Sequence, residues 1–591
     1  MSPERPRGPD ATRAERLGDF AVDARMVRIA AWAVPVGLAS AGLAFALLRL
    51  IGLITNLVFY QRWDTGLVAP GAGAHHPFWL VLLAPAAGGL AIGLLARFGS
   101  DKIRGHGMPE AIEAILVGES RIQPRVALLK PISAAISIGT GGPFGAEGPI
   151  IMTGGAAGSI LAQLLHLSAD ERKTLLVAGA AGGMAATFNA PLASVVLAVE
   201  LLLFEWRPRS FVPVVAAVAT STVARGLLLG TRAVFALPAV HVQVNAGTDA
   251  LCVIAGLTGG LLAVAATGLV YASEDGFHRL PIHWMWWPAL GGLIVGAGGL
   301  IEPRALGVGY DVIDELLTGR AGISLVVGIL VVKSAIWGLS LGSGTSGGVL
   351  APVFMIGAAL GALEGHVLPP VLPGFWALVG LAAVLGGVMR SPLTGVVFPL
   401  ELTHAWPLLL PLLIAATAAY ALSTLALKRS VLTEKIARRG LHLTREYSID
   451  PLEVMLARDV MSAPEPPING GPPPTLDADG AGDVVHADDT LRHVANRFAV
   501  GGLSAAQVVE RGAPDRRIGT ITLSDLLQAR LRDHHEEHHR ERLIGPRPGS
   551  TGSHAGGVSC RDIVGRGHDP GRRAARALGH LRRYVARRAV R

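Results

Sequence analysis

Apolar runs long enough to cross a lipid bilayer recur along this chain, and they constrain its fold more than any other feature of the sequence. A membrane-spanning helix needs about 20 consecutive, mostly apolar residues. Charged residues make up only 16% of the chain, against about 25% in soluble domains. The sequence therefore predicts a polytopic all-α membrane protein. Its candidate spans are Val27–Tyr60, Phe78–Phe98, Phe211–Gly230, Leu251–Tyr271, Ile323–Gly342 and Leu408–Leu427.

Basic residues flank the apolar region at both ends, and the positive-inside rule therefore predicts that both ends are cytoplasmic. This orientation implies an even number of complete crossings. The first 26 residues contain both acids and arginines, so they do not resemble a signal peptide. Because this topology accounts for the net charge of +8, we expect no nucleic-acid binding. The flanking residues are Arg5, Arg7, Arg13, Arg16, Arg25 and Arg28 on one side and Lys428, Arg429, Lys435, Arg438 and Arg439 on the other.

Motifs that would indicate an enzyme or a metal centre are weak in this chain. Cys252 and Cys560 lie too far apart in the sequence to indicate a disulfide framework or a thiolate metal site. Gly342–Gly347 matches G-x-G-x-x-G but follows a long apolar helix instead of a strand, so we expect no dinucleotide site. His535–His539 matches H-E-x-x-H in a run so dense in His and Glu that a solvated helix explains it better. We therefore expect neither an enzyme nor a metal site.

The apolar region contains an internal repeat. Pro149–Gly158 (PIIMTGGAAG) matches Pro352–Gly361 (PVFMIGAALG), 203 positions later. Pro191–Glu200 (PLASVVLAVE) matches Pro392–Glu401 (PLTGVVFPLE) at nearly the same offset. The two matches predict two homologous halves of inverted topology with broken helices. In transporters of this architecture the binding sites lie where the halves meet.

In both halves a glycine loop leads into a helix with a proline in its first turn, where proline is favoured. The loops are Gly145–Gly148 and Gly348–Ala351. A helix N-terminus offers unpaired N–H groups and about half a positive charge, so two such termini in an apolar interior are predicted to bind an anion. Glu147 lies at one of them, although a charge at the bilayer centre costs about 2.5–3.5 kcal/mol. We therefore predict that the Glu147 carboxylate can occupy the anion site itself.

Four motifs, in the right order, resemble those of the CLC chloride channels and chloride/proton exchangers. The resemblance covers about residues 27–440 and implies a homodimer with one anion pathway per subunit. The motifs are Gly105–Glu110 (GHGMPE, family G-S-G-I-P-E), Gly145–Pro149 (GAEGP, family G-R/K-E-G-P), Gly348–Pro352 (GVLAP, family G-x-F-x-P), and the pair Asn189–Leu192 and Arg390–Gly395, where the family has its dimer-interface helices.

Carried over position by position, the resemblance implies that Glu147 is the gating glutamate, which moves in and out of the pathway and exchanges protons with the outside. Lys130 falls where the family has a lysine beneath the pathway. It could act as a counter-charge to the anion or as a helix anchor. The resemblance also implies an anion-binding set, mostly through main-chain amides, made of His106, Gly107, Gly145, Ala146, Gly148, Val349 and Leu350.

Several positions depart from the family pattern. His106 replaces the central-site serine, Leu350 replaces the motif phenylalanine, and Leu432 falls near the tyrosine that closes the inner end. Exchangers carry an internal glutamate just after the first acid of the Pro-Leu repeat, where this chain has Leu201 after Glu200. The loss of this acid favours passive conduction over exchange. Two alternatives stay open: Glu200 is a structural acid or a proton relay, and His106 lines the anion pathway or bonds to backbone.

From about residue 446 the chain becomes polar, with Pro/Gly-rich stretches. Residues 456–462 and 488–531 resemble pieces of a CBS module with a strand–helix–strand–strand–helix order. A full CBS pair needs about twice as many elements, so we predict a shortened CBS-like region and a small α/β cytoplasmic domain. We expect no cofactor, although a nucleotide at the CBS-like region stays an open alternative. The composition beyond about residue 545 predicts disorder.

These observations predict a glutamate-gated chloride channel, with a chloride/proton antiporter as the alternative. We expect it in the plasma membrane, the inner membrane of a bacterium. Its expected partners are chloride or a related small anion, protons, membrane lipid and a second copy of the chain. The predicted parts are an N-terminal segment (1–26), two transmembrane halves (27–230 and 231–427), a linker (428–455), the CBS-like region (456–531) and a charged tail (532–591).

Overall fold

A computed structural model of the protein describes residues 24–71, 75–235, 237, 244–441, 452, 455–462 and 484–538. The chain divides into two units, residues 1–447 and 448–591. Outside the described residues lie the N-terminal segment up to residue 23, part of the predicted linker (442–451 and 453–454), residues 463–483 of the CBS-like region and the tail from residue 539.

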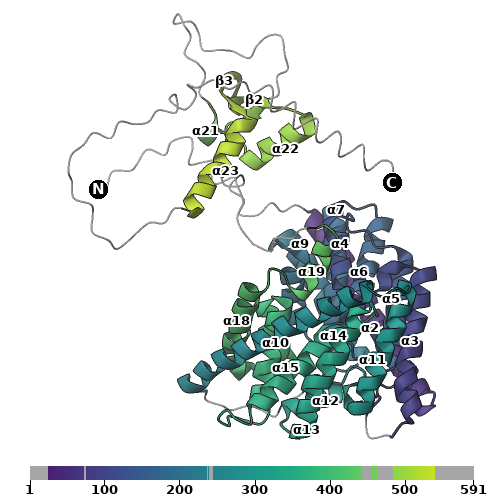
Figure 1. The fold of residues 1–591 in the computed structure, drawn as a ribbon. Helices are drawn as coiled ribbons and strands as arrows, with labels where there is room; N and C mark the ends of the chain where they lie inside the picture. The colour runs from purple at the N-terminus through teal and green to yellow at the C-terminus, as the bar shows by residue number, and fades with distance from the viewer. Residues whose placement is uncertain are drawn as a thin grey trace, which may run out of the picture. The chain divides into compact units, whose positions relative to one another are not determined.

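The first half of the first unit is helical throughout (Figure 1). Proline occupies the start of α5, α8 and α9, the position where its missing N–H costs nothing. The elements are α2 (Arg25–Tyr60), α3 (Phe78–Phe98), η1 (Asp101–Ile103), α4 (Met108–Leu116), α5 (Pro124–Gly139), α6 (Glu147–Leu164), α7 (Ala169–Phe188), α8 (Pro191–Ala198), the π-helical η2 (Val199–Leu203) and α9 (Pro208–Leu228).

The second half repeats this succession of long and short helices. It ends in α19, which is amphipathic and carries basic residues in its last turn. The elements are α10 (Ala246–His278), η3 (Trp284–Trp286), α11 (Trp287–Ile301), η4 (Pro303–Ala305), α12 (Tyr310–Leu317), α13 (Ile323–Gly328), the π-helical η5 (Ile329–Lys333), α14 (Ser334–Gly342), α15 (Leu350–Glu364), α16 (Phe375–Met389), α17 (Pro392–Thr403), η6 (Trp406–Leu408), α18 (Leu409–Ala426) and α19 (Val431–Arg438).

Seven helical segments in the described part of the chain are long and apolar enough to span a bilayer. Five of them contain runs predicted from the sequence, and a sixth, Pro208–Leu228, overlaps the predicted run Phe211–Gly230. The seventh, Trp284–Ile301, escaped the prediction because five glycines interrupt its apolar pattern. Other apolar helices, such as Leu350–Glu364 and Phe375–Met389, are too short to span alone. The predicted fold class, a polytopic helical membrane protein with a small sheet-containing domain, is confirmed.

Helices α3 and α11 pack closely against each other and join the two halves (Figure 1). A Cβ on Gly89 would lie 2.1 Å from the carbonyl oxygen of Pro288, and a Cβ on Gly292 would lie 2.2 Å from that of Pro85. Gly89 and Gly292 are 203 positions apart in the sequence, as are Pro85 and Pro288. The backbones can approach this closely because glycine has no side chain, and the same contact is made from both sides.

The second unit contains a three-stranded sheet of order β1-β2-β3 (Val484–His486, Ala505–Glu510 and Ala513–Thr522). β1 pairs parallel to β2, and β2 pairs antiparallel to β3. With α21 (Ala457–Val460), α22 (Leu491–Gly501) and α23 (Leu523–His538), the chain has the expected strand–helix–strand–strand–helix order. A small apolar core holds these elements together, with Leu491, Phe498, Val508, Ile521 and Leu526 among its members. The assignment to the CBS class stays a prediction.

Candidate anion site

Glycine loops from both halves meet inside the first unit. The amide of Gly105, before α4, donates to the carbonyl oxygen of Thr345 at 3.1 Å. Gly145, before α6, and Gly348, before α15, pair in both directions, with N···O distances of 2.8 and 3.4 Å. These hydrogen bonds bring the N-terminal ends of α4, α6 and α15 together.

The close approach of the loops depends on glycine at two positions. A Cβ on Gly148 would lie 1.7 Å from the carbonyl oxygen of His106. Gly107 has a φ of +89°, and a Cβ there would lie 2.8 Å from the carbonyl oxygen of Gly148. Neither the space nor the backbone conformation suits a larger residue.

Glu147 is the first residue of α6, and its side chain is fully buried. Its Oε1 accepts a hydrogen bond of 3.0 Å from the amide of Ala351, in the first turn of α15. Its Oε2 is buried and has no hydrogen-bond partner among the described residues. A carboxylate from one half therefore binds the helix N-terminus of the other half, the position where such a terminus attracts an anion.

The other residues predicted to contact an anion surround Glu147. All are buried and belong to the paired loops or to the first turns of α4, α6 and α15. Their geometry is consistent with the predicted site, and their contact with an anion stays a prediction. They are Gly107, Gly145, Ala146, Gly148, Val349 and Leu350.

His106 is 4% exposed, and its Nδ1 has no hydrogen-bond partner in the described part of the chain. The neighbouring Glu110 is also buried, and its Oε2 accepts from the amide of Gly107 at 3.0 Å. Its Oε1 lies 3.2 Å from Lys435 Nζ and 2.8 Å from an Arg439 guanidinium nitrogen. Glu110 thus ties the His106 loop to α19 and to the residue that follows it. This role of Glu110 was not predicted, although a glutamate three residues after a helix N-cap is the sequence signature of a capping box.

Lys130 lies on α5 and is completely buried. Its Nζ donates to the carbonyl oxygens of Ile103 and Gly105, at 2.8 and 2.6 Å. Lys333 in the second half makes the same pair of contacts, donating to Ala305 and Gly307 at 2.8 and 2.6 Å. Each lysine holds the glycine loop of its own half, a geometry that supports the anchoring alternative. Lys333 could have been found in the sequence, because it lies 203 positions after Lys130.

Glu200 and Glu401 cap each other's helices across the two halves. Glu200 accepts hydrogen bonds from the amides of Leu393 and Thr394, at 3.2 and 2.9 Å, at the start of α17. Glu401 accepts from the amides of Leu192 and Ala193, at 2.9 and 2.7 Å, at the start of α8. This reciprocal pattern supports the structural alternative for Glu200. Leu201 beside it is buried and lies in η2.

Leu432 is buried in α19, where the sequence analysis noted the absence of a tyrosine. The hydroxyl of Tyr271, on α10, donates to the carbonyl oxygen of the adjacent Val431. A tyrosine hydroxyl is thus present near this position, but it is engaged with the backbone. The sequence analysis did not foresee this contact, because it joins residues 160 positions apart.

Aromatic rings pack beside the convergent loops. The ring centroids of Phe188 and Phe354 lie 6.4 Å apart, and both rings contact Phe398 at 5.2 and 5.3 Å. Tyr310 extends this cluster, with its ring 6.4 Å from Phe188 and 5.9 Å from Phe235. No sequence pattern marked the cluster, since its members come from five separate segments.

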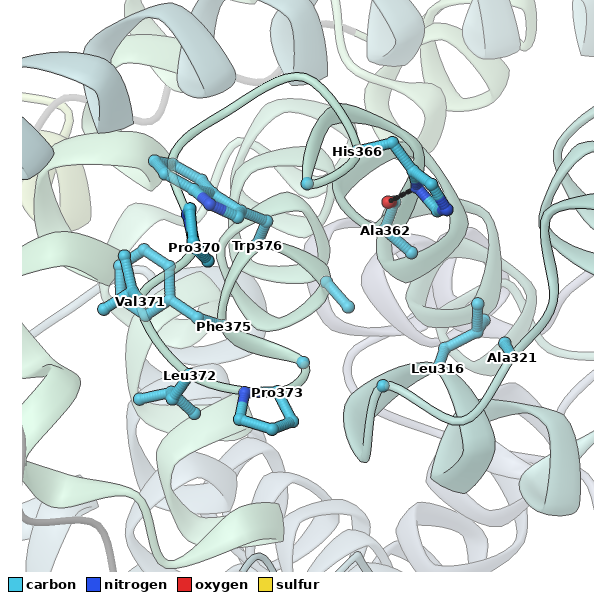
Figure 2. A pocket seen from close by; sticks show the side chains of 14 residues that line it. Leu316, Ala321, Ala362, His366, Pro370, Val371, Leu372, Pro373, Phe375 and Trp376 are labelled. Carbon is cyan, nitrogen blue, oxygen red and sulfur yellow. Dashed lines mark hydrogen bonds between the residues drawn. The ribbon is translucent and has the colours of Figure 1, made fainter.

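A cavity of about 520 Å³ lies elsewhere, around the C-terminal end of α15 and the loop that leads into α16 (Figure 2). Its wall is mostly apolar, with Leu316, Pro370, Val371 and Trp376 among the lining residues. His366 lies on the wall and contacts the carbonyl oxygen of Ala362 (Figure 2). The length of α15, about 22 Å for 15 residues, separates this cavity from Glu147, so we do not connect it with the anion site.

Known proteins share this sequence pattern and this fold. The family described as "Voltage gated chloride channel" matches residues 88–424. The voltage-gated ClC-type chloride channel ClcB of Citrobacter koseri is 30% identical over 406 residues, which are 67% of this chain and 96% of that protein. The ClcB protein of Salmonella typhimurium is 31% identical over 392 residues, which are 65% of this chain and 93% of that protein.

Solved structures agree with the fold. A slow cyanobacterial Cl⁻/H⁺ antiporter superposes with a TM-score of 0.62 at 21% identity, covering 71% of this chain and 99% of that one. A CLC-type fluoride/proton antiporter superposes with a TM-score of 0.60 at 19% identity, covering 68% and 97%. The sequence match and the paired helix N-termini agree, and we conclude that the chain belongs to the voltage-gated chloride channel family, the CLC family of membrane anion transporters.

Proposed function

We propose that the protein conducts chloride, or a related small anion, across the membrane and that the Glu147 side chain is its gate. One observation carries this proposal: the Glu147 carboxylate from α6 accepts a hydrogen bond from the Ala351 amide at the N-terminus of α15. An anion that needs the same amide competes with the carboxylate. Protonation removes the negative charge of Glu147, weakens its hold on the helix terminus and so favours entry of the anion.

Passive conduction is the form of transport that the inner residues support. A coupled exchanger needs a group that passes protons between Glu147 and the cytoplasmic side. Leu201 offers no titratable group at the position where exchangers of this family carry an acid. The neighbouring Glu200 already accepts hydrogen bonds from two amides of α17. Helix capping is therefore sufficient to explain a carboxylate at this position, without a role in proton transport.

Chloride/proton exchange is the second candidate function. Two solved proteins of the same fold are named as proton-coupled antiporters, one for chloride and one for fluoride. Glu147 itself is retained, and exchange would need Glu200 or water to relay the proton. The two candidates therefore differ in whether chloride movement drives stoichiometric proton movement.

Chloride flux from proteoliposomes, measured with and without an imposed pH gradient, distinguishes conduction from exchange. For a channel, a chloride gradient drives chloride flux with little uphill proton movement. Stoichiometric proton uptake on adding chloride would overturn the preference for conduction. Leu201→Glu tests the missing acid, since it should increase proton coupling in a weakly coupled protein. Leu201→Gln is its matched control, because it adds polarity without a titratable proton.

We also propose that two copies form the working unit in the plasma membrane, with both chain ends cytoplasmic. Exposed apolar residues on α9 and α18, such as Val223, Leu227, Leu410 and Leu425, offer a surface for lipid or for a second copy. Cross-linking or mass measurement in detergent tests the stoichiometry. Access of membrane-impermeant thiol reagents to cysteines placed at each end, in a variant without the native cysteines, tests the orientation.

We propose a regulatory role for the CBS-like region. It forms a unit separate from the membrane unit and has its own apolar core. Truncation after Gly440 should leave a dimer with measurable chloride flux. A truncated protein that is stable and dimeric but inactive would contradict this assignment. A nucleotide titration of the full chain tests whether this region binds one.

A further inference from the structure

Tyr310 begins α12 and carries a buried hydroxyl. The preceding Gly309 has a φ of +80°, and Lys333 holds the Gly307 carbonyl oxygen of the same loop. The tyrosine is therefore fixed in place by its backbone. Its hydroxyl has no hydrogen-bond partner among the described residues.

A Cβ on Gly309 would lie 2.7 Å from the side chain of Met355, one turn along α15 from Ala351, so Tyr310 begins its helix beside the helix that binds the Glu147 carboxylate. The rings packed against Tyr310 are those of Phe188 and Phe235, which accept no conventional hydrogen bond. The Oε2 atom of Glu147 is also buried and unpaired within the described residues. Buried polar atoms without partners are rare, and a second arrangement in which the Tyr310 hydroxyl donates to the Glu147 carboxylate would satisfy both atoms.

Tyr310 also lines a cavity of about 120 Å³, together with Thr55, Val68, Val308 and Asp311. Thr55 lies near the C-terminal end of α2, a spanning helix that begins at Arg25. The cavity is thus on the side of the membrane opposite to Arg25, the external side in the proposed orientation. Tyr310 therefore lies on the wall of a cavity at the external side.

We propose that Tyr310 is a positioning residue for the gate. When the Glu147 carboxylate leaves the Ala351 amide, one of its oxygens accepts a hydrogen bond from the Tyr310 hydroxyl, and this bond holds the anion site open. The inference rests on the proposed gating by Glu147 and adds the group that receives the displaced side chain. The corresponding residue of the first half is Met108, which has no hydroxyl. Of the two corresponding positions, only Tyr310 can therefore donate a hydrogen bond to the displaced Glu147 side chain.

Tyr310→Phe removes only the hydroxyl and keeps the ring that packs against Phe188 and Phe235. Loss of one hydrogen bond to the open state should lower chloride flux at neutral pH by about threefold to tenfold. It should also shift activation by external acid to lower pH, because more protonation is then needed to displace Glu147. The thermal stability of the closed protein should not fall, since the hydroxyl has no partner there.

The measurement is chloride efflux from proteoliposomes over an external pH of about 4.5–7.5, with Tyr310→Phe made alone and together with Glu147→Ala. The expected result is a shifted pH profile when Glu147 is present and no further effect when Glu147 is Ala. An equal loss of flux in both backgrounds would show that Tyr310 acts on packing or on the pathway, and would overturn the proposal.

Two further outcomes separate this inference from the proposed function. If Glu147→Ala abolishes the pH dependence but Tyr310→Phe changes nothing, the role of Tyr310 is wrong and the gate stands. If Glu147→Ala keeps the wild-type pH profile, both proposals fail. Tyr60→Phe is the matched control, because its hydroxyl donates to the Ala69 carbonyl oxygen at 2.7 Å and Ala69 lines the same cavity. It should leave the pH profile unshifted.

Discussion

The two halves of the membrane unit differ at the position where a glycine loop leads into a buried helix. The first half has Glu147 there, and the second half has Leu350, which lies 203 positions later in the sequence. The surrounding backbone is the same in both halves. A buried lysine holds two loop carbonyl oxygens in each half, Lys130 in one and Lys333 in the other. The residues that the two halves share therefore form the framework of the site. The differing residues, Glu147 and Leu350, make its two sides chemically different.

The same contrast extends to the loops that the lysines hold. His106 in the first half corresponds to Val308 in the second, and Met108 corresponds to Tyr310. The first-half loop carries the His106 imidazole, and Glu110 ties this loop to Lys435 and Arg439. The second-half loop carries Tyr310, whose buried hydroxyl has no hydrogen-bond partner among the described residues. The two halves thus share equivalent helix termini, whereas the proposed gate, Glu147, and the hydroxyl proposed to receive it, Tyr310, each occur in one half.

The largest expected effect comes from adding a methyl group at Gly148, whose second-half counterpart is already alanine, Ala351. Gly148→Ala would place a Cβ 1.7 Å from the His106 carbonyl oxygen, a clash with backbone that cannot relax locally. We expect a loss of more than about 3 kcal/mol or failure to fold. Ala351→Gly should cost only about 1 kcal/mol. Thermal unfolding in detergent compares the two, and equal losses would show that the loops are not packed as described.

The next largest effect tests the lysines. Lys130→Met and Lys333→Met each leave two buried carbonyl oxygens without their donor, so each should cost about 3 kcal/mol of stability. If both lysines only anchor loops, the two variants lose similar stability and keep the wild-type chloride affinity once folded. Chloride affinity is measured by calorimetric titration. An affinity that falls only in Lys130→Met would show that the two lysines are not equivalent and would assign Lys130 a counter-charge role.

The smallest effect concerns the reciprocal capping acids. Glu200→Gln and Glu401→Gln each weaken the capping of one short helix, at a cost of about 1 kcal/mol. Capping alone predicts that the two variants behave alike, with unchanged proton movement. The measurement is chloride-driven proton movement in proteoliposomes. A change in Glu200→Gln but not in Glu401→Gln would assign Glu200 as a proton relay and would support chloride/proton exchange.

Much of this molecule could be predicted from the sequence, because the physical signals are local or repeated. The lengths of the apolar runs predicted the spans, and the Pro149–Gly158 repeat predicted two halves. The carboxylate of Glu147 beside a glycine loop predicted a residue bound to a helix terminus.

The remaining features join segments that are distant in the sequence. The ion pairs of Glu110 with Lys435 and Arg439, and the ring contact of Tyr310 with Phe188, depend on how the two halves pack. No periodicity or motif encodes such contacts. The equivalence of Lys130 and Lys333 was readable in the sequence once the 203-residue offset was applied to charged residues as well as to apolar ones.

We propose that Glu147 and the transported anion compete for the N-terminus of α15. The most direct test is chloride flux through purified wild-type and Glu147→Gln protein in proteoliposomes, as a function of external pH. Glutamine mimics the protonated, displaced side chain, so the account predicts that flux persists in the variant and loses most of its dependence on external pH. A Glu147→Gln protein that retains the pH profile of the wild type would contradict the account.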